Sequence, residues 1–406
     1  GELAGVAVDL GASWVGPSQD RINALAAELG VATRPTHTAG RKLIRWRGRV
    51  RGYRGTIPRL DPLTLIDTEL MRRRFERLAR SVPVGCPWAA PDAAAADARS
   101  LASWLERSTL TRGPRELMRI ATPTVWGCEP GELSLLHALH YVHAAGGLDP
   151  LLEVEDGAQQ DRLEGGAQGL ALALAARLGP EPLVLGAPVE RIARTEGGSL
   201  ELRAGSLSVG ARRAVVAAPP ALRSGIAFDP PLPHEHEEVA RSFPQGSITK
   251  VYAAYPEPFW RLRGASGEAL SDQGPVTITF DATPPAGSPG ILVGFVGGAD
   301  ARALEGRPSE ERRARTLASL ASLFGSRAAR PLAYLEHSWA HERWSRGGPT
   351  AVAGPGAWTA HGRALREPVG PIHWAGTETA GRWTGFMDGA VRSGERAAAE
   401  VDAALR

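Results

Sequence analysis

Lysine is nearly absent from this sequence, so the positions of the two lysines are informative. Of the 47 lysine and arginine residues, only Lys42 and Lys250 are lysines. The arginine side chain ends in a broad, planar guanidinium group that keeps its charge, whereas lysine ends in a compact ammonium group whose pKa responds to its surroundings. Lys250 lies in the strand-like run 247–255. In a closed apolar site a single cation can stabilise negative charge that develops during a reaction. The alternative is a surface lysine at a strand end.

A glycine-rich segment near the C-terminus is the second feature that could carry chemistry. It reads as a strand at 372–375, a turn at 376–379 and, after Gly385, the start of a long helix. Glycine lets a ligand approach the backbone closely. Free N–H groups and the helix dipole favour negative charge at a helix N-terminus. The segment therefore suits an anionic ligand, and the alternative is a glycine-rich helix packed on a sheet.

His137, His140 and His143 recur at helical spacing and invite comparison with a metal site. No carboxylate or cysteine joins them at ligand spacing, so we expect core or surface histidines and no metal. The two cysteines, Cys86 and Cys128, are too few for a disulfide framework or a four-cysteine zinc site. They favour a reducing, cytoplasmic setting.

Length and composition indicate a globular protein of two domains. The chain has 406 residues, of which 43% are hydrophobic and 22% charged. Its net charge of +3 is small for this length, so neither nucleic acid nor an anionic membrane is an expected partner. No uninterrupted apolar run reaches membrane-spanning length.

Helical and strand-like patterns alternate along the chain, which favours an α/β fold with two domains interleaved in sequence. Residues 214–218 are continuously apolar, which predicts a strand buried on both faces. The other expected strands are at 6–10, 183–185, 189–192, 200–203, 207–209, 247–255, 276–280, 291–296 and 333–339. The region 41–54 is an expected hairpin, and the expected helices are 21–29, much of 63–141, 168–178, 310–323 and the C-terminal segment.

Seven short motifs, in order along the chain, resemble those of the flavin monoamine oxidase family. They are VDLGASWVGP at 8–17, PVERI at 188–192, VVAAPP at 215–220, FDPPLP at 228–233, PFW at 258–260, WSRGG at 344–348 and the block 372–396. The resemblance implies an α/β protein in which a Rossmann-like FAD-binding domain is interleaved with an α+β substrate domain. The implied FAD-binding segments are 1–33, 164–239 and 342–406, and the implied substrate-binding segments are 34–163 and 240–341.

The resemblance also implies roles for single residues. Lys250 matches a lysine that holds a water at flavin N5, Trp339 a tryptophan beside the isoalloxazine, and Trp14 an aromatic residue near the flavin and the cavity. Thr350 and Phe386 occupy positions where many members flank the substrate amine with two tyrosines. The implied catalytic residues are Lys250, Trp339, Thr350 and Phe386. The implied FAD contacts are Gly11, Ala12, Ser13, Trp14, Val189, Ala218, Trp339, Gly376, Thr377, Glu378, Gly385, Phe386 and Met387.

The sequence departs from the family pattern at three places. The GxGxxG fingerprint on a strand, turn and helix is absent, and we interpret this as a first βαβ segment missing before Gly1. Pro349 stands where some members carry the cysteine that binds flavin covalently, so noncovalent FAD is expected. Thr350 and Phe386 replace the two tyrosines, although Phe386 still offers a π face to an amine. This last departure bears on the substrate more than on the reaction.

The implied reaction is FAD-dependent oxidative deamination of a primary monoamine with an apolar or aromatic body. O2 is the acceptor, and the products are an imine that hydrolyses to an aldehyde, ammonia and hydrogen peroxide. Three alternatives stay open: a polyamine oxidase, which would want acidic residues in its cavity, an L-amino-acid oxidase, which would want an arginine for the carboxylate, and a non-catalytic fragment. The expected partners are a small-molecule amine and O2; the oligomeric state is open, with a homodimer as one option.

Overall fold

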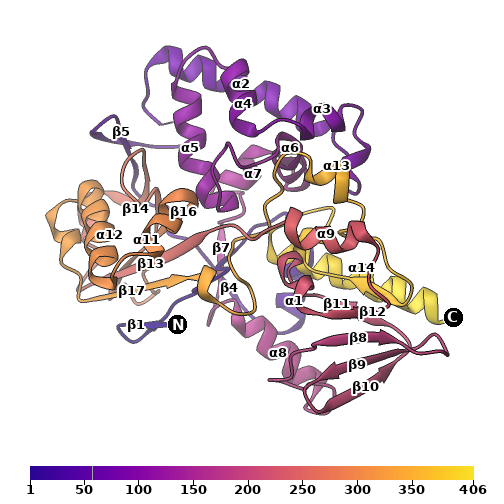
Figure 1. The fold of residues 1–406 in the computed structure, drawn as a ribbon. Coiled ribbons are helices and arrows are strands. Elements are labelled where there is room, and N and C mark those ends of the chain that lie inside the picture. The colour runs from indigo at the N-terminus through magenta and orange to yellow at the C-terminus, as the bar shows by residue number, and fades with distance from the viewer. Residues whose placement is uncertain (57) are drawn as a thin grey trace.

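The computed structural model describes residues 1–56 and 58–406 and has a mixed α/β architecture (Figure 1). A layer of helices from the first part of the chain lies at one end of the molecule. A large sheet with helices beside it lies next to this layer, and smaller sheets lie near the C-terminal helix. The chain passes between these parts several times, so segments far apart in sequence lie side by side.

The large sheet has seven strands in the order β17-β13-β16-β15-β14-β5-β6. The neighbouring strands β13 and β16 are buried along their whole length. All neighbours pair antiparallel except β14 and β5, which are parallel. The strands are β5 (Arg41–Trp46), β6 (Arg49–Tyr53), β13 (Ile248–Tyr255), β14 (Ala265–Ser271), β15 (Ile278–Asp281), β16 (Gly290–Gly297) and β17 (Ala333–Ser338). The helices beside the sheet are α10 (Phe259–Leu262), α11 (Gly298–Glu305) and α12 (Ser309–Phe324).

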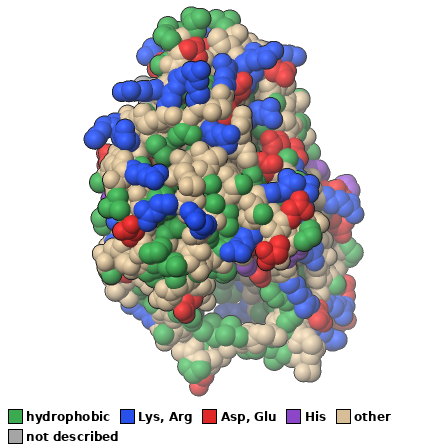
Figure 2. Space-filling model, turned by 90° about the vertical axis from the view of Figure 1, so that its left-hand side faces the viewer, with side chains coloured by type: hydrophobic (Ala, Val, Ile, Leu, Met, Phe, Trp, Pro, Cys, Tyr) green, Lys and Arg blue, Asp and Glu red, His purple; other side chains and the backbone are tan. Residues whose placement is uncertain are grey.

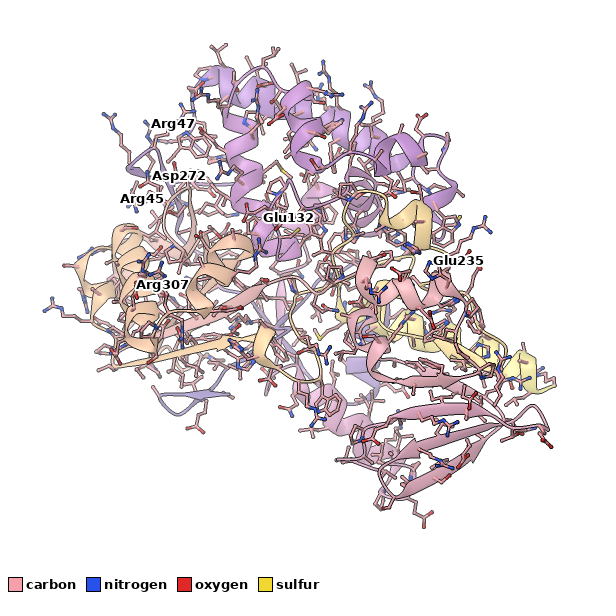
Figure 3. The ribbon with its side chains drawn as sticks, viewed as in Figure 1. Arg45, Arg47, Glu132, Glu235, Asp272 and Arg307 are labelled. Atoms are coloured by element: carbon pink, nitrogen blue, oxygen red, sulfur yellow. The ribbon has the colours of Figure 1, made fainter. Side chains whose placement is uncertain are left out.

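The predicted hairpin at 41–54 is confirmed as β5 and β6. Its turn is tied to the end of β14, where Arg45, Arg47 and Asp272 lie together (Figure 3). The backbone N–H of Arg47 donates to Asp272 Oδ2 at 2.6 Å, and the Arg47 guanidinium pairs with Glu116 Oε2 at 3.0 Å.

On the face of the molecule shown in Figure 2, basic side chains are interspersed with acidic and apolar ones.

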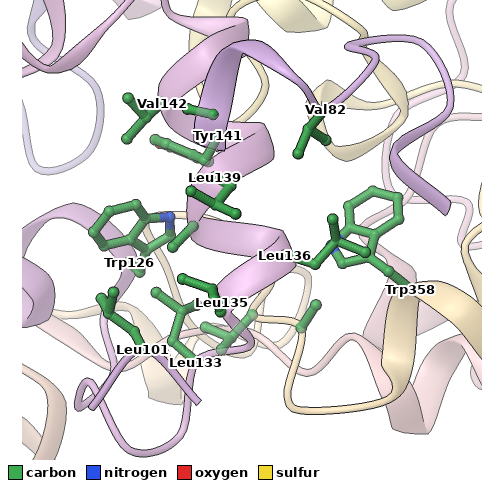
Figure 4. Packing of buried hydrophobic residues seen from close by; sticks show 14 of the residues in the cluster. Val82, Leu101, Trp126, Leu133, Leu135, Leu136, Leu139, Tyr141, Val142 and Trp358 are labelled. Carbon is green, nitrogen blue, oxygen red and sulfur yellow. The ribbon is translucent and has the colours of Figure 1, made fainter. Parts of the chain in front are cut away.

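The helical layer confirms that much of 63–141 is helical. Three of its helices begin at side-chain caps, in which Asp61, Ser100 and Ser134 accept hydrogen bonds from backbone N–H groups of the first turn. The last of these helices is buried on almost every side, and its leucines pack against Trp126 and Trp358 (Figure 4). The helices are α2 (Pro62–Arg80), α3 (Ala93–Asp97), α4 (Leu101–Ser108), α5 (Gly113–Trp126), α6 (Leu135–Ala144) and α7 (Leu148–Leu152).

Smaller sheets and four longer helices make up the rest. The sheets are β1 (Glu2–Leu3) with β2 (Val6–Ala7); β3 (Trp14–Val15), β7 (Asp161–Leu163) and β4 (Thr33–Pro35); β10 (Leu207–Ala211), β9 (Leu200–Ala204), β8 (Arg191–Arg194) and β12 (Ala227–Asp229); and β11 (Ala214–Val216) with β18 (Ile372–Trp374). The helices are α1 (Asp20–Glu28), α8 (Gln168–Leu178), α9 (His234–Ser242), α14 (Met387–Leu405) and the short α13 (Ala357–His361). Asp388 of α14 accepts from the N–H groups of Arg21 and Ile22, which fixes α1 against α14.

Three predicted strands differ from the structure. Residues 183–185 form no strand: the glycines Gly179 and Gly186 on either side have positive φ, and Leu185 is 89% exposed. The strand predicted at 6–10 pairs only at its first two residues, because the chain then turns toward the large sheet. The strand predicted at 214–218 is β11, in which Val215 is 44% exposed. Within the described residues β11 pairs only with β18, so an apolar run did not guarantee burial on both faces.

Candidate active site

The ammonium group of Lys250 is buried inside the molecule and is held by a loop far away in sequence. The residue is 3% exposed, and β13 carries it between β16 and β17. Its Nζ donates to Asp9 O at 2.8 Å, to Gly11 O at 2.8 Å and to Ser13 Oγ at 2.6 Å. The segment 9–13 therefore closes over this end of the sheet, which excludes the surface-lysine alternative.

The surroundings of Lys250 make its charged form unusually costly. Burial is the largest cause that lowers the pKa of Lys250, the nearby Arg162 guanidinium also lowers it, and Asp9 opposes the shift; together they bring the pKa to about 7. An ammonium group with this pKa changes its charge near neutral pH, as groups that take part in acid–base or electrostatic catalysis often do.

Three aromatic side chains, Trp14, Tyr252 and Phe295, surround the Lys250 ammonium, and Phe280 packs against two of them, Trp14 and Phe295. We call these four rings the aromatic box. Nζ lies 5.2 Å from the ring centroid of Trp14, 5.6 Å from Tyr252 and 5.5 Å from Phe295. Trp14 contacts Phe280 with ring centroids 5.2 Å apart. The rings attract the cation through their π faces and keep water away.

Trp339 closes the same loop from the other side. Its Nε1 donates to Leu10 O at 2.8 Å. A Cβ at Gly11 would lie 2.9 Å from Trp339 Cζ2, so only glycine leaves room for the indole there. The structure thus brings Gly11, Ser13, Trp14, Lys250 and Trp339 together, and Ala12 is exposed on the same loop.

Thr350 belongs to a second group of predicted residues, in the C-terminal part of the chain. Thr350 is buried, and its carbonyl accepts from Gly246 N at 3.0 Å. The next N–H, that of Ala351, donates to Glu378 Oε1 at 3.3 Å, which links this segment to the turn at 376–379. Gly348 lies beside Trp339 and Ile248, so the second group adjoins the first.

Phe386 stands between two aromatic residues just before α14. Its ring centroid is 4.9 Å from Trp383 and 5.9 Å from Tyr141. Gly385 has a φ of +82°, and a Cβ there would lie 2.5 Å from the Tyr141 hydroxyl. Glycine is therefore required at 385 by both conformation and space, and it fixes where Phe386 lies.

The turn at 376–379 presents backbone to a ligand. Gly376 has a φ of +116°, and among the described residues a Cβ there would meet only Glu378 Oε2 at 3.5 Å and Ala217 O at 3.9 Å. Thr377 Oγ1 donates to Phe386 O at 2.8 Å, which joins this turn to the start of α14. An open glycine turn beside a helix N-terminus fits an anionic cofactor.

The remaining predicted contacts are more dispersed. Met387 packs against the cluster of α1 and β3, and Ala218 packs beside β11. Val189 lies just before β8 and is partly exposed, away from the aromatic box. Because these three residues lie in different parts of the structure, they would contact an extended ligand and would not form one reaction centre.

The sequence interpretation missed several residues of the site. Arg162 is the register partner of Trp14, and its guanidinium carbon lies 4.8 Å from the Trp14 ring centroid. The Tyr252 hydroxyl donates to Asp9 O at 2.6 Å. Phe280 and Phe295 complete the box. Of these, only Tyr252 had a usable signal, because residues two apart on a strand share a face with Lys250.

Each of the three histidines on α6 makes a hydrogen-bond contact inside the helical layer. His137 Nδ1 accepts from Trp358 Nε1 at 3.0 Å, His140 Nε2 contacts Val84 O at 2.9 Å and His143 Nδ1 contacts Val82 O at 2.7 Å. Across residues 1–56 and 58–406, no group of three or more histidine, cysteine, aspartate or glutamate side chains is placed to hold a metal ion.

Comparison with known proteins gives the class of this enzyme. The structure is similar to putrescine oxidase solved with putrescine bound, with a TM-score of 0.95 and 31% identity, covering 99% of this chain and 90% of that one. The chain is 54% identical over 405 residues to the putative flavin-containing monoamine oxidase AofH of Mycobacterium tuberculosis, covering 100% of this chain and 88% of the relative. It is 34% identical to an L-amino acid dehydrogenase of a Synechocystis species, covering 97% of this chain and 84% of that protein. The fold is that of an FAD-dependent amine oxidase.

Residues 1–402 match the family described as flavin containing amine oxidoreductase, and the chain belongs to that family. Its cofactor is FAD, and the open turn at Gly376 with the adjoining N-terminus of α14 fits the negative charge of such a cofactor. Within the part of the chain that the structure describes, no helix is both long and apolar enough to cross a membrane.

Proposed function

We propose that this protein oxidatively deaminates a primary amine with an apolar or aromatic body. The amine, O2 and water would give an aldehyde, ammonia and hydrogen peroxide. Bound FAD, held noncovalently because Pro349 replaces a linking cysteine, supplies the two-electron chemistry. The single observation that carries the proposal is the buried Lys250 ammonium within the aromatic box.

Lys250 has two tasks in this proposal. It fixes the loop 9–13 through three hydrogen bonds, and it offers positive charge in a place that excludes water. An ammonium group has three hydrogens, and all three have acceptors in the chain. Holding a water as well would therefore require Ser13 or a loop carbonyl to give up its bond.

Trp339, Thr350 and Phe386 would shape the place where the amine reacts. Trp339 is held by its bond to Leu10 O and presents a flat apolar surface. Phe386 offers a π face to an amine, and Thr350 leaves more room than a tyrosine would. This arrangement favours an apolar or aromatic body, because the amine would meet aromatic rings at Trp339 and Phe386.

The test is the visible spectrum of the protein loaded with FAD, before and after anaerobic addition of tyramine, putrescine or L-phenylalanine. Bleaching of the flavin bands by tyramine, followed by recovery and peroxide formation in air, is the expected result. Bleaching by putrescine alone would replace the monoamine with a diamine. A protein that binds FAD and is bleached by none of the three would contradict the proposed reaction.

A second candidate is an amino acid as the amine. The similarity to an L-amino acid dehydrogenase supports it, since that relative is 34% identical over almost the whole chain. The same panel separates the two candidates, because L-phenylalanine differs from a simple arylalkylamine by its carboxylate.

A further inference from the structure

Positive charge is concentrated in one segment of this chain. Residues 41–80 contain 13 of the 47 lysine and arginine residues but only four of the 44 aspartate and glutamate residues. The small net charge of +3, from which no anionic membrane is expected, is therefore an average over unlike regions. The segment forms the hairpin of β5 and β6 and the helix α2, which lie in the upper part of the view in Figure 1, away from β10.

The outward side of α2 carries apolar side chains where a surface helix normally carries polar ones. Leu63, Ile66 and Leu70 are 69%, 59% and 45% exposed, and their spacing of three and four residues puts them on one side of the helix. Leu110 is 88% exposed and lies next to this part of α2, because its backbone N–H donates to the Asp67 carboxylate at 2.9 Å. We call Leu63, Ile66, Leu70 and Leu110 the apolar patch, and exposed apolar side chains grouped in this way mark contact surfaces.

Arginines lie at both ends of the apolar patch. At the N-terminal end of α2, the helix cap Asp61 lines a hollow of about 390 Å³. The other side chains that line the hollow are those of Trp46, Arg47, Arg49 and Arg51. At the other end of the patch, Arg73 and Arg77 are exposed on α2. In Figure 2, where the end of the molecule with α2 is at the top, basic side chains predominate over the upper part of the face.

The carboxylates beside the hollow are already engaged within the chain. Glu116 pairs with Arg47 at 3.0 Å, and Asp61 accepts a hydrogen bond from the first turn of α2 at 2.9 Å. Among the residues that the structure describes, no carboxylate forms an ion pair with Arg49 or Arg51, and Arg51 donates to a backbone carbonyl at 3.2 Å. These two guanidinium groups are therefore available to an anion outside the chain.

A partner for this face must offer apolar and anionic groups together. Nucleic acid offers phosphate groups but no apolar surface for exposed leucines. A bilayer with anionic lipids offers both, since leucine and isoleucine side chains enter the boundary of the acyl chains while arginines contact the headgroups. A bilayer is also a broad surface that is reached by one end of a molecule, and α2 lies at such an end (Figure 1).

We propose that the apolar patch and the arginines of the hairpin dock this protein on the surface of a membrane that contains anionic lipids. The helix α2 would lie along the interface, with Ile66 and Leu70 among the acyl chains and Arg49 and Arg51 against lipid phosphates. Docking of this kind needs no helix that crosses the bilayer. The inference goes beyond the proposed oxidase function and does not depend on it, because none of these residues belongs to the candidate active site.

Flotation of the FAD-loaded protein with lipid vesicles tests the docking. One set of vesicles is phosphatidylcholine alone, and the other has equal parts of phosphatidylcholine and phosphatidylglycerol. The wild type should bind the mixed vesicles at least about 10-fold more tightly than the neutral ones, because each arginine near an anionic surface contributes about 5-fold. High salt should weaken the binding. Failure to float with the mixed vesicles, or equal affinity for both sets, would overturn the proposal.

A pair of substitutions in the apolar patch separates a membrane from other anionic partners. Ile66→Gln combined with Leu70→Gln should lower the affinity for mixed vesicles at least about 10-fold. The matched control is Leu262→Gln combined with Leu332→Gln, whose side chains are 71% and 65% exposed on other elements, and it should bind like the wild type. Undiminished binding by the α2 variant would point to a soluble polyanion or an acidic protein and refute membrane docking. Equal losses in the two variants would refute a defined docking face.

A second pair of substitutions tests the arginines of the hairpin. Arg49→Gln combined with Arg51→Gln should lower the affinity for mixed vesicles at least about 10-fold and leave the weaker binding to neutral vesicles unchanged. Arg212→Gln combined with Arg330→Gln is the matched control, because it removes the same charge from exposed positions elsewhere, and it should bind nearly as the wild type does. Since all the replaced side chains are exposed, the variants should keep the wild-type melting temperature. A control variant that loses as much affinity as the hairpin variant would mean that binding follows net charge, and the proposed face would be wrong.

Discussion

Lys250 on β13 and the histidines on α6 are both buried ionisable groups, yet they occupy different kinds of environment. Burial lowers the pKa of Lys250 to about 7 and that of His137 to about 3. The histidine ring is hydrogen-bonded to Trp358 and packs against the rings of Tyr141 and Trp358. Lys250 is bonded to a loop that lies about 240 residues away in sequence, and its ammonium faces three aromatic rings.

The comparison teaches that a shifted pKa does not by itself indicate a site. A neutral histidine in a packed core is stable because it never needs to be charged. Lys250 is poised near neutral pH, and it lies where segments from the first, middle and last parts of the chain meet. Convergence of distant segments on one ionisable group is the feature that separates the two regions.

The largest expected effect is on catalysis, from Lys250→Met. Loss of the cation should lower kcat by about 10²- to 10³-fold, as removal of a single preorganised electrostatic group commonly does. Stopped-flow measurement of anaerobic reduction and of reoxidation shows which half of the reaction is slowed. Lys42→Met is the control: it removes the other lysine, which pairs with Glu153 and Glu268, and it should keep normal turnover per folded molecule. Unchanged turnover in Lys250→Met would remove Lys250 from the mechanism.

The histidine region should respond in stability and not in catalysis. His137→Phe leaves the buried Trp358 Nε1 without an acceptor, so the free energy of unfolding should fall by about 1–3 kcal/mol. Urea denaturation measures this, and turnover per folded molecule should be unchanged. His143→Phe, at a half-buried position on the same helix, should lower the free energy of unfolding by less than His137→Phe does. A loss of turnover in His137→Phe without a loss of stability would place α6 in the active site.

The pH dependence of stability sharpens the contrast. The folded-state pKa of Lys250, about 7, lies below its ordinary value of 10.5, so the unfolded chain binds more protons between these two values. Stability from this group therefore rises with pH across that window, by at most about 1.4 kcal/mol per pH unit. Denaturation of the wild type and Lys250→Met at pH 7.5 and 9.5, at constant FAD, gives the difference. Parallel pH profiles would mean that Lys250 titrates normally.

The smallest expected effect is at Phe386. Phe386→Leu keeps an apolar side chain and removes the π face, which should raise KM for an amine about 2- to 5-fold through the loss of a cation–π contact of about 0.5–1 kcal/mol. Steady-state kinetics with tyramine measures it. Phe243→Leu is the control, since Phe243 is buried and its ring packs edge-on against Trp358. Equal changes in both variants would mean that Phe386 contributes packing alone.

Part of the site was predictable from sequence because single residues identified it. Lys250 was one of two lysines, and glycines at 376 and 385 indicated close backbone approach; both have positive φ in the structure. Arg162 could not be singled out, because arginine occurs almost everywhere on this chain and nothing local distinguishes a buried one. The strand predicted at 183–185 was wrong because an apolar triplet forms a strand only where another strand offers its N–H and C=O groups.

The sequence by itself determined the local structure: the hairpin of β5 and β6, the helix at 168–178, the capped helices of the helical layer and the order of family motifs. These follow from side-chain periodicity, caps and turns, all of which act over a few residues. Only the tertiary structure decided which loop holds Lys250, which rings surround it and which arginine stands beside Trp14. Burial, pKa and hydrogen-bond partners depend on segments that meet across hundreds of residues, and no local pattern encodes that meeting.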